Sequence, residues 1–584
     1  MTLWSEGVSP GWRALAALAI VLYLALILPT LSRQGIGWDE QVDRDIARSY
    51  GSAQYGWFSG SGFDASQSRL PMYLGGIVFA ATGRDSLRLS RAMTVVMGAL
   101  TLACVIFLGR QVFGPGVGEL AGLLLATSPF FLSFSRVAFT ESDLFVTAFL
   151  AGFLICMEGL RRTREIGWTL ASGLALGGAI SSKLTAGSFV LLALALPWLC
   201  KGRWDDGASE PLPKRDGRTL WAATLLLLVG IATVWWWGCL RMMRSGSPAP
   251  KGAWFPLVLL WGAIAVWMLR RRQRRLPARA VGAWIAAYAI ATFFLVPPVH
   301  LTEPDLLVGM LRRAFHDLLA GEGNPGQFAV FYAACLVFKS SPAIGAALLA
   351  SPAAALWQAR RRVELRLLLA ALLLYGFLLL RLPLAQTFYL VPLLPVLALL
   401  AADQARRWRA RPALLAVAGL LAFGWLGLDV ARCYPDFNLN GYQYLGERRL
   451  AGRATLGYRG VVQVTTDGTE QALRWMADHA EPGSIVATYL LASHIVHAAG
   501  PPGITLENGL RSQADLLAGA DYAVIELGST LSDDRGTDPR QATIYDLPYD
   551  PVILRRDFSR VFSVRRAFGL EVASVWKRRV PRSP

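Results

Sequence analysis

The sequence predicts a polytopic α-helical membrane protein with a small α/β domain at its C-terminal end. Apolar blocks of roughly 17–20 residues, long enough to cross a bilayer, recur along the first three quarters of the chain. The 584 residues are 54% hydrophobic and only 17% charged. A soluble protein would not carry so many uninterrupted apolar blocks. After Arg432 the apolar blocks stop, and shorter alternating runs typical of strands follow.

The first block, Ala14–Leu31, is not followed by a small-residue cleavage site, so we interpret it as an anchored span. A long loop, Ser32–Ser90, comes next. Its apolar piece, Met72–Thr82, is too short to cross a bilayer and predicts an interfacial or re-entrant helix. Phe328–Phe338 predicts a second helix of this kind.

The remaining apolar blocks bring the prediction to about thirteen spans, with boundaries good to a few residues. They lie at Met93–Leu108, Val117–Leu132, Ser142–Leu160, Trp168–Ser181, Leu184–Leu199, Leu220–Trp237, Trp254–Leu269, Val281–Val296, Pro342–Trp357, Leu367–Leu380, Gln386–Ala402 and Pro412–Val430.

The net charge of +18 does not predict a nucleic-acid partner, because the basic residues gather in short clusters between spans. Arg270–Arg275 and Ala359–Arg366 are two such clusters. Basic loops face the cytoplasm in multi-pass proteins of the cell (inner) membrane. With an odd number of spans, all the strongly basic loops then fall inside, while the loop that begins with Asp39 and Glu40 falls outside.

The composition change divides the chain into a transmembrane domain, residues 1–431, and an extracytoplasmic α/β domain, residues 432–584. About 150 residues suffice for a separate core. Gly468–Ala480 has helical spacing, whereas PGSIVATYLL, ADYAVIELG and FGLEVASVWKR read as strands.

The cysteines and histidines do not define a metal site. None of the six cysteines belongs to a Cys-x-x-Cys pair, which favours isolated thiols over a metal centre or disulfides. The histidines lack a further ligand at suitable spacing, so a divalent metal stays an open question. The residues are Cys104, Cys156, Cys200, Cys239, Cys335, Cys433, His300, His316, His494 and His497.

Several charged residues lie where spans leave the membrane on the predicted outer face. Asp39 and Glu40 can be read as solvated loop carboxylates in an acidic stretch with Asp43 and Asp45. A charge at bilayer depth costs roughly 2.5–3.5 kcal/mol on insertion scales, so the charges at Arg136, Glu141, Asp143 and Lys183 need partners or polar ligands. One interpretation is mutual ion pairing that orients helices. The other is an anionic lipid headgroup held by cations, opposite a carboxylate that acts as base. The residues are Asp39, Glu40, Arg69, Arg136, Glu141, Asp143 and Lys183.

An ordered series of motifs resembles the GT-C glycosyltransferases of the protein O-mannosyltransferase and lipid A aminoarabinose transferase superfamily. Asp39 and Glu40 follow the first span, and Arg69 stands before Leu-Pro in the same loop. LLLATSPFFLSFSRVAFTESD resembles the family's third span, GGAISSKLTAG its hairpin lysine, and FYLVPLLP its late Tyr- and Pro-rich span.

The resemblance implies inverting transfer of a sugar from a polyprenyl-phosphate donor to a lipid, glycan or protein acceptor at the outer face, with no required cofactor. By position, Asp39 would be the catalytic base and Glu40 would support acceptor or donor placement. Arg69, Arg136 and Lys183 would hold the lipid phosphate, and Glu141 and Asp143 would form a second acidic patch.

The chain also departs from the family pattern. It has Ser-Arg-Leu-Pro where aminoarabinose transferases have a Glu-Lys-Pro-Pro type segment. Phe388 precedes Tyr389, where the family commonly has a basic residue, so Arg381 and Lys339 are the candidates to replace that cation.

Two other functions remain open at this point. A lipid-linked sugar flippase or transporter would place its charges at mid-membrane within broken helices. A non-catalytic cell-envelope assembly protein would use the tail as its working part and leave the Asp39 loop free to vary in charge.

Overall fold

The computed structural model describes fifteen stretches of the chain. They are residues 9–32, 38–51, 70–138, 143–163, 166–189, 192, 325–382, 387–407, 412–437, 440, 444, 468–489, 503–508, 517–526 and 551–580. The spans predicted at Leu220–Trp237, Trp254–Leu269 and Val281–Val296 lie outside these residues, as do Arg69 and Glu141.

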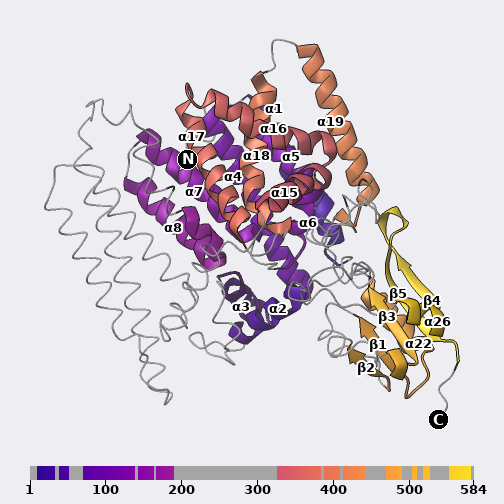
Figure 1. Ribbon diagram of the computed structural model, residues 1–584. Helices are drawn as coiled ribbons and strands as arrows, with labels where there is room; N and C mark the ends of the chain where they lie inside the picture. Colours follow the sequence, from indigo (N-terminus) through magenta and orange to yellow (C-terminus); the bar gives the residue numbers. More distant parts are fainter. Residues whose placement is uncertain are drawn as a thin grey trace, which may run out of the picture.

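Most of the described chain is one group of packed helices that share a continuous apolar core (Figure 1). Its helices are α1 (Pro10–Ile27), α4 (Leu87–Phe113), α5 (Val117–Thr127), α6 (Pro129–Ser135), α7 (Asp143–Thr163), α8 (Ile166–Ser182), α15 (Pro325–Lys339), α16 (Pro342–Gln358), α17 (Val363–Arg381), α18 (Leu394–Arg407) and α19 (Pro412–Cys433).

Five helical segments among the described residues are long and apolar enough to cross a membrane, or six if the bent pair α5–α6 counts as one span. They confirm a helical membrane protein. The five are Pro10–Thr30, Leu87–Phe113, Asp143–Arg162, Val363–Arg381 and Thr387–Arg407. The segment predicted as a span at Leu184–Leu199 begins with a 3-10 helix, η5 (Leu184–Ser188), instead of an α-helix.

The segment predicted as a span at Val117–Leu132 is bent. The segment consists of α5 and α6, whose axes differ by 67°. Ser128 between them has an extended backbone, with φ −70° and ψ 118°, and Pro129 begins α6. Proline disfavours the helical conformation in the residue before it and lacks the N–H that would continue the helix, so the break falls there.

Part of the predicted loop Ser32–Ser90 is also helical. Trp38–Gly51 forms α2, and Leu70–Thr82 forms α3, which matches the short helix predicted there. Ile46 and Ala47 on one face of α2 pack with Met72 and Tyr73 of α3 in a small buried cluster. This amphipathic packing is why α2 forms although it contains six charged side chains in its Asp39–Arg48 portion.

The two ends of the helical part differ in chemistry. At the end that we call the Glu40 end, Arg91 near the start of α4 reaches Glu40 and the backbone of Leu31 after α1. We call the opposite end the basic end. There Arg406 of α18 donates a hydrogen bond to the carbonyl of Phe113, the last residue of α4.

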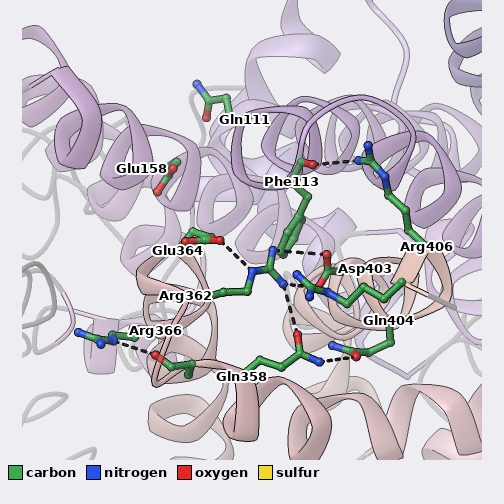
Figure 2. A network of polar contacts seen from close by, with 12 residues as sticks. Gln111, Phe113, Glu158, Gln358, Arg362, Glu364, Arg366, Asp403, Gln404 and Arg406 are labelled. Atoms are coloured by element: carbon green, nitrogen blue, oxygen red, sulfur yellow. Dashed lines mark hydrogen bonds and ion pairs between the residues drawn. The ribbon is translucent and has the colours of Figure 1, made fainter. Parts of the chain in front are cut away.

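Figure 2 shows the polar network of the basic end, centred on Arg362. Its guanidinium donates to Glu364 at 2.9 Å and to Asp403 at 2.6 Å. Asp403 also accepts from Arg407, and the Gln358 amide donates to the Gln404 side chain at 2.8 Å. These contacts join α16, α17 and α18 at one level.

The tail contains a five-stranded mixed sheet in the order β2-β1-β3-β5-β4. β1 pairs in parallel with β2 and β3, whereas β5 runs antiparallel to β3 and β4. Segments predicted as strands contain β1, β3 and β5, and α22 falls within Gly468–Ala480. The bounds are α22 (Thr469–His479), β1 (Ile485–Tyr489), β2 (Thr505–Asn508), β3 (Tyr522–Glu526), α26 (Pro551–Asp557), β4 (Phe558–Arg565) and β5 (Glu571–Arg578).

The sheet lies at the lower right of the helical part in Figure 1, below α19. Its junction with the helices involves η10 (Ala567–Gly569), whose Phe568 packs against both the helical core and the core of the sheet. The Ala567 N–H donates to the Asp436 carboxylate at 3.3 Å.

Candidate active site

A buried ion pair anchors the acidic pair after the first span. Arg91 donates from Nε to Glu40 Oε1 at 2.9 Å and from Nη2 to Oε2 at 2.8 Å. The Ala138 N–H also donates to Glu40 Oε1, and Arg91 Nη1 donates to the Leu31 carbonyl at 2.6 Å. Such a two-bond arrangement fixes both the distance and the orientation of the carboxylate.

This contact set determines where Asp39 lies. Asp39 occupies the first turn of α2, directly before the anchored Glu40. Glu40 is completely buried and both its oxygens accept bonds from within the protein, so it positions the start of α2. The sequence resemblance implied a substrate-placing role for Glu40; its contacts favour an indirect one, through the position of its neighbour.

Arg136 lies at the point where the bent pair ends. It follows α6 as the C-cap residue, with the non-helical values φ −112° and ψ 6°. Its Nη1 donates to the Pro435 carbonyl, and its guanidinium carbon stands 5.3 Å from the centre of the Phe437 ring. The completely buried Arg136 thus connects α6 to the segment after α19.

Lys183 and Asp143 form a second ion pair at the Glu40 end. Lys183 Nζ lies 3.0 Å from Asp143 Oδ1, across the start of α7 and the end of α8. The same ammonium lies 4.8 Å from the centre of the Phe388 ring and 4.5 Å from that of Tyr389. Two ring faces and one carboxylate hold this cation in place. Asp143 Oδ2 is buried and has no hydrogen-bond partner.

Lys339, the last residue of α15, is completely buried. Its Nζ stands 5.4 Å from the centre of the Phe134 ring and 5.7 Å from that of Phe130, both in α6. The neighbouring Ser340 hydroxyl is buried without a hydrogen-bond partner. Polar groups with unused bonding capacity beside a cation suit an anionic ligand.

The rings of Phe134 and Phe388 join these groups into one cluster. Their centres lie 6.5 Å apart in an edge-to-face arrangement. Lys339 stands over the first ring and Lys183 over the second, while Arg136 follows Phe134 by two residues. Side chains from α6, α15 and the 3-10 helix η7 (Thr387–Leu393) and that of Lys183, directly after α8, are therefore brought together at the Glu40 end.

The segment after α19 packs against this cluster. Asn440 Nδ2 donates to the Lys339 carbonyl at 2.9 Å, which satisfies the C-terminal end of α15. The Tyr444 ring stands 6.1 Å from that of Phe338, and its hydroxyl donates to Asp429 at 2.6 Å. Burial raises the pKa of the Tyr444 hydroxyl well above its ordinary value, and the bond to the Asp429 carboxylate raises it further.

The structure brings together Arg136, Asp143, Lys183, Lys339 and Tyr389 from the candidates named by sequence. Arg381 ends α17, and the contacts described above do not involve it. Sequence reasoning missed Arg91, Phe134 and Phe437. Arg91 carried a signal, since it is a charge at the start of an apolar helix and needs a partner there. The two phenylalanines carried none, because any apolar helix contains such residues.

Among the residues that the structure describes, no group of three or more His, Cys, Asp or Glu side chains is placed to hold a metal ion. The ionisable groups of the cluster are the cations of Lys183 and Lys339 over aromatic rings, the Asp143 carboxylate paired with Lys183, and Arg136 just after α6. Such a set can bind a phosphate group and stabilise it as it departs with negative charge.

The fold and this cluster define a helical membrane protein with buried cations and aromatic rings gathered at one end. The family model described as dolichyl-phosphate-mannose-protein mannosyltransferase matches residues 68–237. This match confirms the resemblance to GT-C glycosyltransferases that the motifs predicted. It contains Arg136, Asp143 and Lys183, whereas Asp39 precedes it and Lys339 follows it.

Two solved structures are similar at low identity. The archaeal oligosaccharyltransferase AglB from Archaeoglobus fulgidus, in complex with an inhibitory peptide and a dolichol-phosphate, is 14% identical, with a TM-score of 0.44 over 88% of this chain and 69% of that chain. ArnT from Cupriavidus metallidurans, bound to undecaprenyl phosphate, is 16% identical, with a TM-score of 0.32 over 97% and 98%. Both TM-scores are below 0.5. No curated protein matches the chain.

Proposed function

We propose that the protein transfers a sugar from a polyprenyl-phosphate donor to an acceptor on the outer face of the cell membrane, with inversion at the anomeric carbon and Asp39 as the base. The observation that carries this proposal is that Lys339 and Lys183 stand over the adjoining rings of Phe134 and Phe388. The buried Arg136 follows Phe134 by two residues, close in the chain to Ala138, whose N–H bonds to Glu40. The family match supports the class of reaction.

The chemistry divides between the two parts of the site. The acceptor oxygen forms a bond to the anomeric carbon of the sugar as the bond from that carbon to the phosphate oxygen breaks. Asp39 takes the acceptor proton, and the polyprenyl phosphate leaves as an anion. The leaving group needs cations instead of a protonating acid, and Arg136, Lys183 and Lys339 supply positive charge near it.

Glu40 and Arg91 contribute indirectly in this proposal. The two-bond contact between them holds the first turn of α2, and with it Asp39, at the Glu40 end. A base displaced by about an ångström loses much of its effect, so the anchor supports catalysis without contacting substrate.

Turnover of a purified enzyme in proteoliposomes tests the proposal. The probe is undecaprenyl-phosphate-mannose, followed by a panel of undecaprenyl-phosphate-linked hexoses and pentoses, with a membrane lipid extract as acceptor source and release of undecaprenyl phosphate as the readout. Asp39→Asn keeps the side-chain size but removes the base, so we expect turnover to fall about 10²-fold or more. Binding of undecaprenyl phosphate should remain.

Asp45→Asn is the matched control, because Asp45 lies in the same helix and its exposed carboxylate pairs with Arg48. It should leave turnover unchanged. A near-normal rate for Asp39→Asn would place the base elsewhere, with Glu141 and Asp143 as the first alternatives. Vectorial movement of the intact donor across the membrane without release of undecaprenyl phosphate would instead support a flippase.

A further inference from the structure

A groove of about 620 Å³ opens at the basic end, far from the cation cluster along the helices. Its wall is formed by the last turns of α16 and by the start of α17. Sites that hold small molecules or headgroups commonly have roughly this volume. The lining residues are Ala353, Leu356, Trp357, Ala359, Arg360 and Arg366.

One side of the groove is apolar and exposed. Ala353, Leu356 and Trp357 recur at the spacing of one helix face. The exposed fraction is 82% for Trp357 and 58% for Leu356, high values for side chains of this size. Tryptophan at the end of a membrane helix favours the depth where headgroups meet acyl chains. The face thus suits the upper part of a lipid chain.

The other side of the groove is basic. Arg366 donates from Nε to the Ala359 carbonyl at 3.0 Å and from Nη2 to the Arg360 carbonyl at 3.3 Å, so its guanidinium is held at the rim. Figure 2 shows it at the edge of the polar network, away from the carboxylates bonded to Arg362. Within the described stretches, Arg360, Arg361 and Arg366 form no ion pair with a carboxylate.

We propose that this groove binds the headgroup of an anionic phospholipid from the leaflet at the basic end. The phosphate would lie against Arg360 and Arg366, and the first methylenes of an acyl chain would lie along Leu356 and Trp357. Basic pockets between membrane helices on the side of the basic loops bind anionic headgroups by this combination of charge and apolar contact. The apolar wall distinguishes a lipid from free phosphate as the occupant.

The site is separate from the proposed catalytic one. Arg362 next to it is already neutralised by Glu364 and Asp403, which leaves the adjacent arginines to carry the excess positive charge. None of the residues that line the groove belongs to the proposed catalytic site, so lipid binding here does not depend on sugar transfer.

Native mass spectrometry of the full-length protein, titrated with phosphatidylglycerol or with phosphatidylcholine of the same chains, tests it. We expect the wild type to bind one phosphatidylglycerol at least fivefold more tightly than phosphatidylcholine. Arg360→Gln should weaken phosphatidylglycerol binding about fivefold, the effect of one basic residue at an anionic lipid surface. Trp357→Ala should weaken the binding of both lipids, because it removes apolar contact.

Arg84→Gln is the control, since Arg84 is an exposed arginine in the turn before α4 at the opposite end. It should bind as the wild type does. Equal affinities for the two lipids, or equal losses in Arg84→Gln and Arg360→Gln, would overturn the proposal. Displacement of phosphatidylglycerol by millimolar inorganic phosphate would overturn it as well, by showing a free-phosphate site.

Discussion

Glu40 and Arg91 face each other across two hydrogen bonds, with their side chains only 0% and 1% exposed. This pair joins α2 to α4, which begins 36 residues after α2 ends, and both charges are buried. Removing one partner of a buried pair leaves the other charge uncompensated, at a cost of about 3–5 kcal/mol.

Arg91→Gln should therefore lower the free energy of unfolding by about 3–5 kcal/mol, measured as a lower melting temperature in detergent. Arg88→Gln, an exposed change one turn earlier in α4, should stay within about 0.5 kcal/mol of the wild type. Adding Glu40→Gln to Arg91→Gln should recover part of the loss, because no buried charge then remains. Equal melting temperatures for Arg88→Gln and Arg91→Gln would contradict this role.

Arg136→Lys should weaken binding of undecaprenyl phosphate about tenfold, although it keeps the charge. Arg136 already donates from Nη1 to the Pro435 carbonyl. The planar guanidinium has further N–H groups that can bind a phosphate at the same time, whereas the lysine ammonium lacks this fixed fork. The dissociation constant by native mass spectrometry measures the effect. Arg432→Lys, in the exposed last turn of α19, should bind normally. Unchanged binding by Arg136→Lys would move the phosphate site away from α6.

Gly118→Ala should destabilise the protein by about 1–3 kcal/mol, the usual cost of overpacking. A Cβ at this position would lie 2.1 Å from the Ile106 carbonyl oxygen, so α4 and α5 could not keep their close approach. Gly419→Ala in α19 is the matched control, because its Cβ would meet no atom within 4 Å. The melting temperatures of the two variants test this prediction. A Gly118→Ala protein as stable as Gly419→Ala would contradict the close approach of α4 and α5 at Gly118.

Phe568→Ala should loosen the tail from the helical part. Phe568 packs against both cores, and losing roughly 1.4 kcal/mol of apolar contact would raise the open population about tenfold. Limited proteolysis should then release the tail about tenfold faster. Val561→Ala, an exposed position of β4, should be cleaved at the wild-type rate. Equal rates for the two variants would show that η10 does not hold the junction.

Arg84→Cys and Arg361→Cys should be labelled from opposite sides of the membrane. Arg84 lies before α4 at the Glu40 end, and Arg361 lies beside Arg362 at the basic end. Following the orientation rule for basic loops, a membrane-impermeant maleimide applied to intact cells should reach Arg84→Cys alone. Labelling of Arg361→Cys from outside would invert the predicted topology.

The order of apolar blocks was enough to predict the helical membrane class, because crossing a bilayer requires long apolar helices whatever their partners are. The bend at Pro129 was missed, since block length alone does not show where a helix turns. The helix α2 was missed for a related reason. Its residues Ile46 and Ala47 gain helical stability only by packing on Met72 and Tyr73 of α3.

The sequence by itself determined the membrane class, the motif series and the identity of the charges at one end. The tertiary structure alone decided which charges meet: Glu40 with Arg91, Asp143 with Lys183, and Lys339 with the rings of α6. A charge at membrane depth needs a partner, and a charged residue beside an apolar block can be recognised from the sequence. Which partner it finds depends on helix packing between residues far apart in the chain, because only that packing sets their distance and orientation.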